Sequence, residues 1–340
     1  MATVTSLDVA RLAQVSQSAV SRTFTPGASV SEVTRAKVEE AARKLGYRPN
    51  AVARSLITRR SRMIAVVMSY LDNQFYPVVL EKISQRMQRD GYHVLLFIAD
   101  TREVDSVLAE LMQYQVDGVV LASTSVSSAL ALRCSDAGVP VVLFNRTVRD
   151  GQVTSSVTSD NYEGGRLVAR HLVDLGHERI AYIAGMEDSS TNLDRERGFR
   201  DALIEHGRRC FGRAVGNYDF EEAKLAARQL FAGPAHQRPD AVFVANDHMA
   251  IAVMDTLRME LGLRIPLDVS VVGFDNVRQA AWGSYQLTSV DQDADAMIEA
   301  TAALLLDQID GKVHSSSVVL PVRLVVRGST LRRNSLKGKP

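Results

Sequence analysis

Three polar side chains near the N-terminus are spaced so that they can form hydrogen bonds with the edges of nucleic-acid bases. If the stretch from 16 to 24 is helical, Gln17 and Ser18 lie at its start and Arg22 one turn further on, all on the outer face. Arginine can form two parallel hydrogen bonds with guanine, glutamine can do so with adenine, and serine can pair with either base. The chemistry that these residues offer is recognition of a base sequence in the major groove of DNA.

Two short helices joined by a tight turn would hold these side chains in place. Ser6 can cap a first helix over 7–13, and Ser16 can cap a second helix after the turn at 14–15. Because so few residues connect the two helices, they must cross, which predicts a helix-turn-helix.

A third helix is predicted over 32–45, with Ser31 as its cap and Gly46 at its end. Three short helices of this kind make one small domain. The alternative interpretation of the helix-turn-helix pattern is a small helical bundle with a polar surface and no role in recognition.

The distribution of charge favours a nucleic-acid partner. Residues 1–60 contain ten basic and four acidic side chains, a net charge of +6. The whole chain has a net charge of only +1, so the remainder carries −5. Such asymmetry indicates that the basic end meets a polyanion, because neutralisation of phosphates and release of their counterions dominate the affinity.

Five segments of this basic region carry a more specific signal. They read Leu-Asp-Val-Ala at 7–10, Val-Ser at 15–16, Val-Ser-Arg at 20–22, Ser-Glu-Val-Thr-Arg at 31–35 and Gly-Tyr-Arg-Pro-Asn-Ala-Val-Ala-Arg-Ser-Leu at 46–56. This dense and nearly ungapped pattern resembles the headpiece of LacI/GalR-family transcriptional regulators. The resemblance implies a DNA-binding domain at 1–48 whose first two helices form the helix-turn-helix. We assign Ser16, Gln17, Ser18 and Arg22 to its DNA-binding surface.

The resemblance also implies a hinge helix at 50–56, within a linker at 49–61, that folds on DNA and inserts Leu56 into the minor groove. Pro49 ends the preceding segment, Asn50 can cap, and two helical turns are marginal in water without a partner surface. We therefore add Asn50, Ala53 and Leu56 to the predicted DNA contacts. The alternative is an ordinary interdomain linker.

From residue 63 onward, short apolar runs alternate with longer amphipathic segments. The apolar runs are Met63–Met68, Val94–Ile98, Val119–Ala122, Val141–Phe144, Ile180–Ala184, Val242–Ala245 and Val269–Phe274. Helices are expected between them, at 76–90, 103–114, 162–175, 192–206, 221–231 and 249–261. Continuous Val, Ile and Leu strands that alternate with helices predict a doubly wound α/β fold, with parallel sheets covered on both faces.

The family resemblance continues to about residue 327. It implies that 62–340 is an effector-binding and dimerisation domain with two lobes of the periplasmic-binding-protein type. Lobe 1 is expected at about 62–160 and 292–321, and lobe 2 at about 161–291 and 322–340, so that the backbone crosses between the lobes three times.

Polar residues follow most of the predicted strands, at the sheet edge where ligands of open parallel sheets bind. They are Ser69, Ser123, Asn145, Asn246, Asp247 and Asp275. A cleft lined in this way suits a ligand rich in hydroxyl or amide groups. The alternatives are local: Asp247 as the N-cap of a helix near 249, Asn145 and Ser123 as turn residues, and Asp275 as the cap of a turn.

The resemblance identifies individual cleft residues. It implies that Arg195, Asn246 and Asp275 bind the effector, that Phe220 stacks on it, and that Phe75, Asn145 and Thr191 also line the cleft. Phe75 and Phe220 can equally be core residues. Arg146 adds a cation that would suit an acidic sugar or a sugar phosphate, although the alternation of side chains along a strand can also direct it away.

Several other classes of protein are disfavoured. The chain lacks a G-x-G-x-x-G sequence, a phosphate-binding loop and a G-x-S-x-G elbow, so we expect neither an enzyme nor a bound cofactor. The two cysteines and seven histidines show no metal-ligand spacing. A solute-binding protein for transport would need a signal peptide, which the N-terminus does not resemble, and no apolar run would span a membrane.

The sequence therefore predicts a cytoplasmic transcriptional regulator of the LacI/GalR type, which we expect to act as a repressor. Its partners would be double-stranded, palindromic operator DNA, a second copy of the chain, and a small polar effector such as a sugar.

Overall fold

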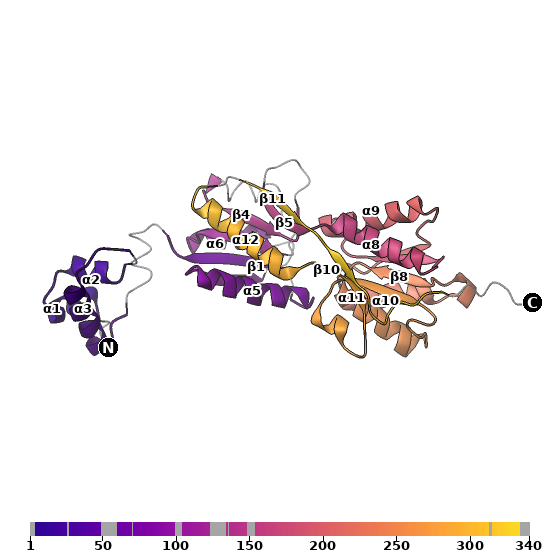
Figure 1. The fold of residues 1–340 in the computed structure, drawn as a ribbon, viewed down its shortest axis with the longest axis horizontal. Helices are drawn as coiled ribbons and strands as arrows, with labels where there is room; N and C mark the ends of the chain where they lie inside the picture. Colours follow the sequence, from indigo (N-terminus) through magenta and orange to yellow (C-terminus); the bar gives the residue numbers. More distant parts are fainter. Residues whose placement is uncertain are drawn as a thin grey trace, which may run out of the picture. The chain divides into compact units, whose positions relative to one another are not determined.

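The computed structural model consists of two units. It describes residues 4–25, 27–48, 60–69, 71–98, 104–122, 134, 136–147, 154–312 and 315–333. The first unit ends at Ser61 and the second begins at Arg62 (Figure 1). Within the described ranges, no helix is long and apolar enough to cross a bilayer.

Three short helices form the first unit: α1 (Ser6–Ala13), α2 (Gln17–Thr23) and α3 (Glu32–Leu45). Their caps are Thr5, Ser16 and Ser31, whose side-chain oxygens accept hydrogen bonds from backbone amides in the first turn. The prediction that Ser6 caps the first helix is wrong. Thr5 takes this position because the Asp8 carboxylate accepts a hydrogen bond from the Thr5 amide, which completes a reciprocal capping box.

A small apolar cluster holds these helices together. It comprises Val9, Ala10, Ala13, Val20, Val38, Ala41 and Ala42. These side chains come from all three helices, so the opposite face of α2 is left at the surface of the unit.

Two six-stranded sheets form the second unit. Their strand orders are β11-β5-β4-β3-β1-β2 and β12-β10-β9-β8-β6-β7. All paired strands are parallel except β10 and β12, which are antiparallel. The first sheet contains β1 (Met63–Met68), β2 (His93–Ile98), β3 (Gly118–Ala122), β4 (Val141–Phe144), β5 (Ser155–Ser159) and β11 (Ser317–Leu320). The second contains β6 (Ile180–Ala184), β7 (Gly212–Val215), β8 (Ala241–Val244), β9 (Ser270–Asp275), β10 (Thr288–Asp291) and β12 (Arg323–Val325).

Helices pack on both sheets and complete two lobes, as the doubly wound prediction requires. Lobe 1 has α5 (Phe75–Arg89), α6 (Val104–Gln113) and α12 (Ala294–Ile309). Lobe 2 has α8 (Asn161–Asp174), α9 (Ser190–Glu205), α10 (Phe220–Phe231) and α11 (Asp247–Asp255). Shorter turns are a π-helical one at Thr256–Glu260, which continues α11, and 3₁₀ turns at Ala235–Gln237 and Arg278–Ala281.

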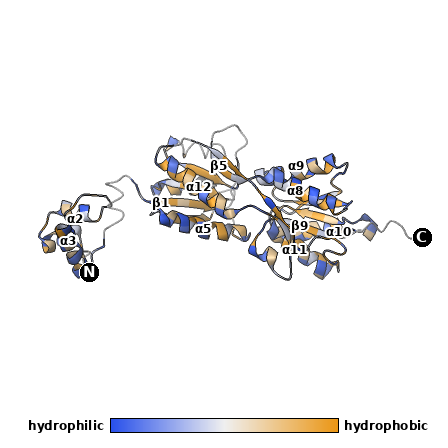
Figure 2. Cartoon of the chain, viewed as in Figure 1, coloured by the Kyte–Doolittle hydropathy of each residue, from blue (hydrophilic) through white to orange (hydrophobic). Residues whose placement is uncertain are grey.

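The central strand β1 shows why both faces of the sheet are covered. Its side chains alternate: Ile64 and Val66 join the apolar cluster that includes α5 and α12, whereas Ala65 and Val67 join a second cluster on the other face. All four are fully buried. Figure 2 shows the hydrophobic residues gathered along the strands, as expected of parallel strands covered on both sides.

Two helices of lobe 2, α8 and α9, lie unusually close together because glycines stand at their contact. A Cβ atom on Gly165 would lie 2.1 Å from the Arg195 carbonyl oxygen, and one on Gly198 would lie 1.9 Å from the Tyr162 carbonyl oxygen. Gly165 therefore serves helix packing, which is consistent with the absence of a phosphate-loop spacing around it. This contact fixes the backbone that carries Arg195.

The chain passes between the two sheets three times. β5 ends at Ser159 in the first sheet and leads to α8 of lobe 2, β10 leads to α12 of lobe 1, and β11 leads to β12 of the second sheet. The ends of β5 and β10 thus meet where the lobes join. This junction carries the polar cavity described below.

Candidate functional site

The outer face of α2 presents the side chains that were predicted to read bases. Gln17, Ser18 and Arg22 are exposed, and the cap Ser16 is exposed beside them. Nε2 of Gln17 donates to Oγ of Ser6 at 3.0 Å, and Oγ of Ser18 lies 2.9 Å from Oγ of Ser16. These four side chains therefore offer one guanidinium group, one amide and two hydroxyl groups at the surface.

Two contacts fix α2 within its unit. Val20 and Thr23 are buried on its inner face. Nη1 of Arg35, from α3, donates to the Thr23 carbonyl oxygen at 3.1 Å, which holds the end of α2 against α3. The remaining predicted DNA contacts, Asn50, Ala53 and Leu56, lie outside the described residues.

The second candidate site is a small polar cavity where the lobes meet. Its volume is about 10 Å³, and its lining comprises Asn73, Tyr76, Asn145, Arg146, Thr191, Arg195, Tyr218, Asn246 and Asp275. An open groove of about 860 Å³ adjoins it, lined by Ser69, Leu71, Asp72, Gln74, Ile98, Met186, Asn217, Tyr218, Asp219, Phe220 and His248. Tyr218 lines both, so the inner cavity and the outer groove adjoin at this residue.

Arg195 is the most completely held side chain of the inner cavity. It is 2 % exposed, and its guanidinium carbon lies 3.6 Å from the centre of the Phe274 ring. Nε donates to Oδ1 of Asn161 at 2.8 Å, and Nη1 donates to the Ala245 carbonyl oxygen at 2.6 Å. The guanidinium group is thus fixed before any ligand binds, which lowers the entropic cost of recognition.

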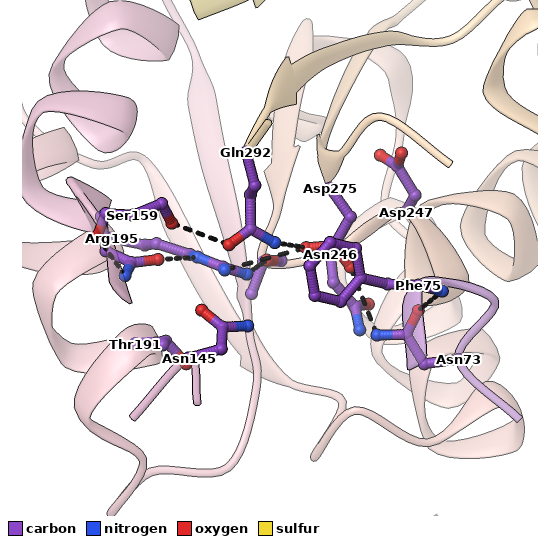
Figure 3. A network of polar contacts seen from close by, with 12 residues as sticks. Asn73, Phe75, Asn145, Ser159, Thr191, Arg195, Asn246, Asp247, Asp275 and Gln292 are labelled. Carbon is purple, nitrogen blue, oxygen red and sulfur yellow. Dashed lines mark hydrogen bonds and ion pairs between the residues drawn. The ribbon is translucent and has the colours of Figure 1, made fainter. Parts of the chain in front are cut away.

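Asp275 accepts hydrogen bonds from lobe 1 and from the segment that joins β10 to α12. Nε2 of Gln292 donates to Oδ1 at 2.6 Å, and Nδ2 of Asn73, from lobe 1, donates to Oδ2 at 3.2 Å (Figure 3). Nη2 of Arg195 lies 3.8 Å from Oδ1. Burial nevertheless raises the pKa of the Asp275 carboxyl to about 6, against the opposing effects of Arg195 and of the two amide donors.

Two asparagines leave polar atoms without a hydrogen-bond partner among the described residues: Oδ1 of Asn145 and Nδ2 of Asn246. Both side chains are buried and line the inner cavity. One atom is an acceptor and the other a donor, so together they match a hydroxyl or an amide group.

Asn246 also corrects an interpretation of the sequence. Its Oδ1 accepts a hydrogen bond from the Met249 amide at 2.9 Å, so Asn246 caps α11 and Asp247 does not. Asp247 is fully buried and makes its contacts elsewhere.

Thr191 lies at the contact between the lobes. Nη1 of Arg146, from lobe 1, donates to its Oγ1, which also lies 3.2 Å from the Tyr218 hydroxyl group. The Arg146 guanidinium carbon is 5.7 Å from the centre of the Tyr218 ring. Arg146 therefore faces the cavity rather than pointing away.

The two predicted aromatic residues lie in different surroundings. Phe75 is 4 % exposed and stacks at 6.3 Å on Phe144, so it belongs to the core of lobe 1 beside the cavity. Phe220 lines the outer groove, with its ring 5.5 Å from the ring of His248.

The sequence reasoning missed Asn73, Tyr218 and Gln292. Figure 3 shows Gln292 between Ser159 and Asp275, and its Oε1 accepts from Oγ of Ser159 at 2.7 Å. Tyr218 stands two residues before Phe220 and, with Tyr76, lines the inner cavity. These three residues were hard to identify from the sequence, because polar residues occur in loops for many structural reasons.

Ser123, another predicted cleft residue, lies outside the described residues.

Known proteins match the chain along almost its whole length. Residues 5–50 match the family "Bacterial regulatory proteins, lacI family", and residues 169–330 match "Periplasmic binding protein-like domain". The HTH-type transcriptional regulator CelR of Thermobifida fusca is 34 % identical over 339 residues, which cover 96 % of each chain.

Two solved structures share the fold. One is the lac repressor dimer bound to operator and the anti-inducer ONPF, with a TM-score of 0.87 and 29 % identity, over 97 % of this chain and 100 % of that one. The other is a complex of the transcriptional regulator CelR with cellobiose, with a TM-score of 0.72 and 33 % identity, over 96 % and 99 % of the two chains. These relatives are regulators and not enzymes.

Proposed function

The chain belongs to the LacI family of bacterial regulatory proteins, and from that premise we propose that it is a repressor whose affinity for operator DNA is changed by a sugar or sugar derivative bound between its two lobes. The DNA would be double-stranded and palindromic, because a symmetric dimer presents two copies of α2 to two half-sites. We place the protein in the cytoplasm, where it would meet its operator.

In this proposal, the exposed face of α2 reads the base sequence. Arg22 has the donors for a guanine and Gln17 the donor and acceptor for an adenine, while Ser16 and Ser18 contribute hydroxyl groups. The predicted hinge residues Asn50, Ala53 and Leu56 would add contacts in the minor groove.

The observation that carries the effector site is the pair of unsatisfied atoms in the inner cavity. Within the described part of the chain, Oδ1 of Asn145 and Nδ2 of Asn246 are buried without partners. Leaving such groups unpaired costs roughly 1–3 kcal/mol each. A ligand with a hydroxyl group between them, and with further hydroxyl groups toward Arg195 and Asp275, would recover that free energy. The outer groove, which adjoins the cavity at Tyr218, gives room for the rest of such a molecule.

Effector binding can reach the DNA because the cavity walls come from both lobes. Asn73 of lobe 1 donates to Asp275 of lobe 2, and Arg146 of lobe 1 donates to Thr191 of lobe 2. A ligand that competes with these contacts, or extends them, shifts the equilibrium between lobe arrangements. Coupling of this kind is worth about 1–3 kcal/mol. An effector that disfavours the operator-binding arrangement is an inducer, and one that favours it is a corepressor.

A thermal-shift panel tests the proposal. Cellobiose, which the related CelR binds in its complex, is included with D-ribose, D-gluconate and hypoxanthine. A compound at 100 times its dissociation constant stabilises the native state by about 2.7 kcal/mol, which is readily measured as a rise in melting temperature. We expect a sugar or sugar derivative, and not hypoxanthine, to give the largest shift and the Asp275→Asn variant to lose it. A shift that is the same in Asp275→Asn would place the effector elsewhere.

A further inference from the structure

Asp247 is a buried acid that the effector site, as described so far, does not use. It is 0 % exposed, follows the cavity residue Asn246 and forms no ion pair among the described residues. Burial, with a smaller contribution from the nearby Asp275, raises the pKa of its carboxyl well above the ordinary value. Burial of a carboxyl group without a paired cation costs free energy unless hydrogen bonds satisfy its oxygens.

Both oxygens of Asp247 accept hydrogen bonds, one from the turn that follows Asp275 and one from the neighbouring strand β10. The Val277 amide donates to Oδ2 at 2.9 Å, and Oγ of Ser289, on β10, donates to Oδ1 at 2.6 Å. Oγ of Ser289 in turn accepts a hydrogen bond from the Asn276 amide at 3.0 Å. Asp247 and Ser289 therefore bind two successive amides directly after Asp275.

This turn needs such support because its backbone is strained. Asp275 has a φ angle of 120° and Asn276 one of 52°. Non-glycine residues rarely adopt positive φ angles, and they persist there only when the surrounding structure holds them. The contacts from Asp247 and Ser289 are made to the amides of this strained turn.

A glycine makes room for this arrangement. A Cβ atom on Gly273 would lie 2.1 Å from Oδ1 of Asp247. Gly273 is paired with Ser289 across the strands β9 and β10, so the carboxyl group occupies the space that a side chain at 273 would fill. The backbone of β9 and the Asp247 side chain are thus fitted to each other.

A simpler role for Asp247 would be to stabilise the start of α11. Asn246 already caps this helix through the Met249 amide, and both contacts of Asp247 come from other elements. The helix therefore does not require this carboxyl group.

We propose that Asp247 is a positioning residue, whose carboxyl group holds the turn at 275–277 in the conformation that directs Asp275 into the effector cavity. This rests on the proposed function, in which Asp275 accepts hydrogen bonds from the effector. Figure 3 shows the side chains of Asp247 and Asp275 on neighbouring segments, with only Asp275 joined to the network that lines the cavity.

Hydrogen exchange on the full-length protein tests the positioning role without any ligand. In Asp247→Asn and Asp247→Ala, the amides of Asn276 and Val277 should exchange about tenfold faster or more, because their acceptors are lost or displaced. The amides of α11 should keep their protection. Asp240→Asn is the matched control, since Asp240 is also buried and also accepts from two backbone amides, those of Glu178 and Arg179.

A double variant separates positioning from general packing. Gly273→Ala alone should displace the carboxyl group and speed exchange at 276 and 277. In an Asp247→Ala background the same change should have little further effect, because the colliding oxygen is gone. Unchanged exchange at 276 and 277 in both Asp247 variants would overturn the proposal, as would an equal change in Asp240→Asn or equal effects of Gly273→Ala in the two backgrounds.

The effect of Asp247 on effector affinity is measured with whichever of the four panel compounds raises the wild-type melting temperature. Asp247→Asn should bind that compound about tenfold more weakly while melting as a folded protein. Wild-type affinity in Asp247→Asn, with loss of binding in Asp275→Asn, would refute positioning alone. Wild-type affinity in both variants would refute the proposed effector site, and the exchange data would then still report whether Asp247 holds the turn.

Discussion

The raised pKa of Asp275 predicts an unusual dependence of stability on pH. The carboxyl group titrates at about 6 in the folded protein, against 3.8 as its ordinary value. When the folded pKa of an acid is raised, the folded state binds the proton more tightly than the unfolded state does. The stabilisation is then complete at low pH and is lost as the pH rises from 3.8 to 6.

The size of the effect follows from the difference in pKa. A shift of one unit corresponds to about 1.4 kcal/mol, so the whole loss amounts to about 3 kcal/mol. Nearly half of it, about 1.4 kcal/mol, falls between about pH 5 and pH 7.5. The Asp275→Asn variant cannot titrate at this position and therefore lacks this contribution.

Urea unfolding of the wild-type protein and of Asp275→Asn, at steps across this pH range, measures the effect. The difference between their free energies of unfolding cancels the titration of those groups whose pKa the substitution leaves unchanged. We expect the wild-type protein to lose about 1.4 kcal/mol relative to the variant on going from about pH 5 to pH 7.5, with little further change at higher pH. A difference that is flat over this range, or that favours the wild-type protein as the pH rises, would show that the carboxyl group is not held in a desolvated cavity.

Three further predictions concern the DNA-binding surface and the fold. Arg22→Ala should weaken the binding free energy for the preferred operator by about 1–3 kcal/mol and relax the preference at one base pair per half-site. Equal weakening on all sequences in a binding assay would instead identify Arg22 as a phosphate contact. Leu56→Ala should weaken specific operator binding and leave the melting temperature and the sugar affinity almost unchanged, and a lower melting temperature would contradict a role confined to DNA. Gly198→Ala should destabilise lobe 2 by about 1–3 kcal/mol or more in urea unfolding, because the added Cβ atom would collide with the Tyr162 backbone. The control Gly283→Ala should be nearly neutral, because the space around Gly283 is open.

The apolar strands could be predicted from the sequence because their burial shows in composition. The runs at 63–68, 141–144 and 180–184 coincide with β1, β4 and β6 residue for residue. The polar strand β5 was missed, although all five of its residues are buried. Ser156 and Ser159 are tolerated there because Ser317 and Gln292 satisfy their hydroxyl groups. Partners so far away in the chain leave no local pattern.

Prediction of the cavity from the sequence meets the same limit. The types of residue at the strand ends predicted a polar cleft, and the family resemblance named Arg195, Asn246 and Asp275. The donor from Asn73 to Asp275 comes from 202 residues away, so only the fold brings the two together. The cap of α11 was misplaced by one residue, because Asn246 and Asp247 are both good caps and only the buried contacts of Asp247 distinguish them.

The central claim, that a ligand in the interlobe cavity controls DNA binding, is tested most directly by operator titrations at fixed salt. Wild-type protein, Asp275→Asn and Arg195→Ala are each titrated with and without the panel compound that stabilises the wild type. We predict that the compound changes wild-type operator affinity by about 5- to 150-fold, and that both variants still bind operator but no longer respond to the compound. A wild-type response in both variants would contradict the account.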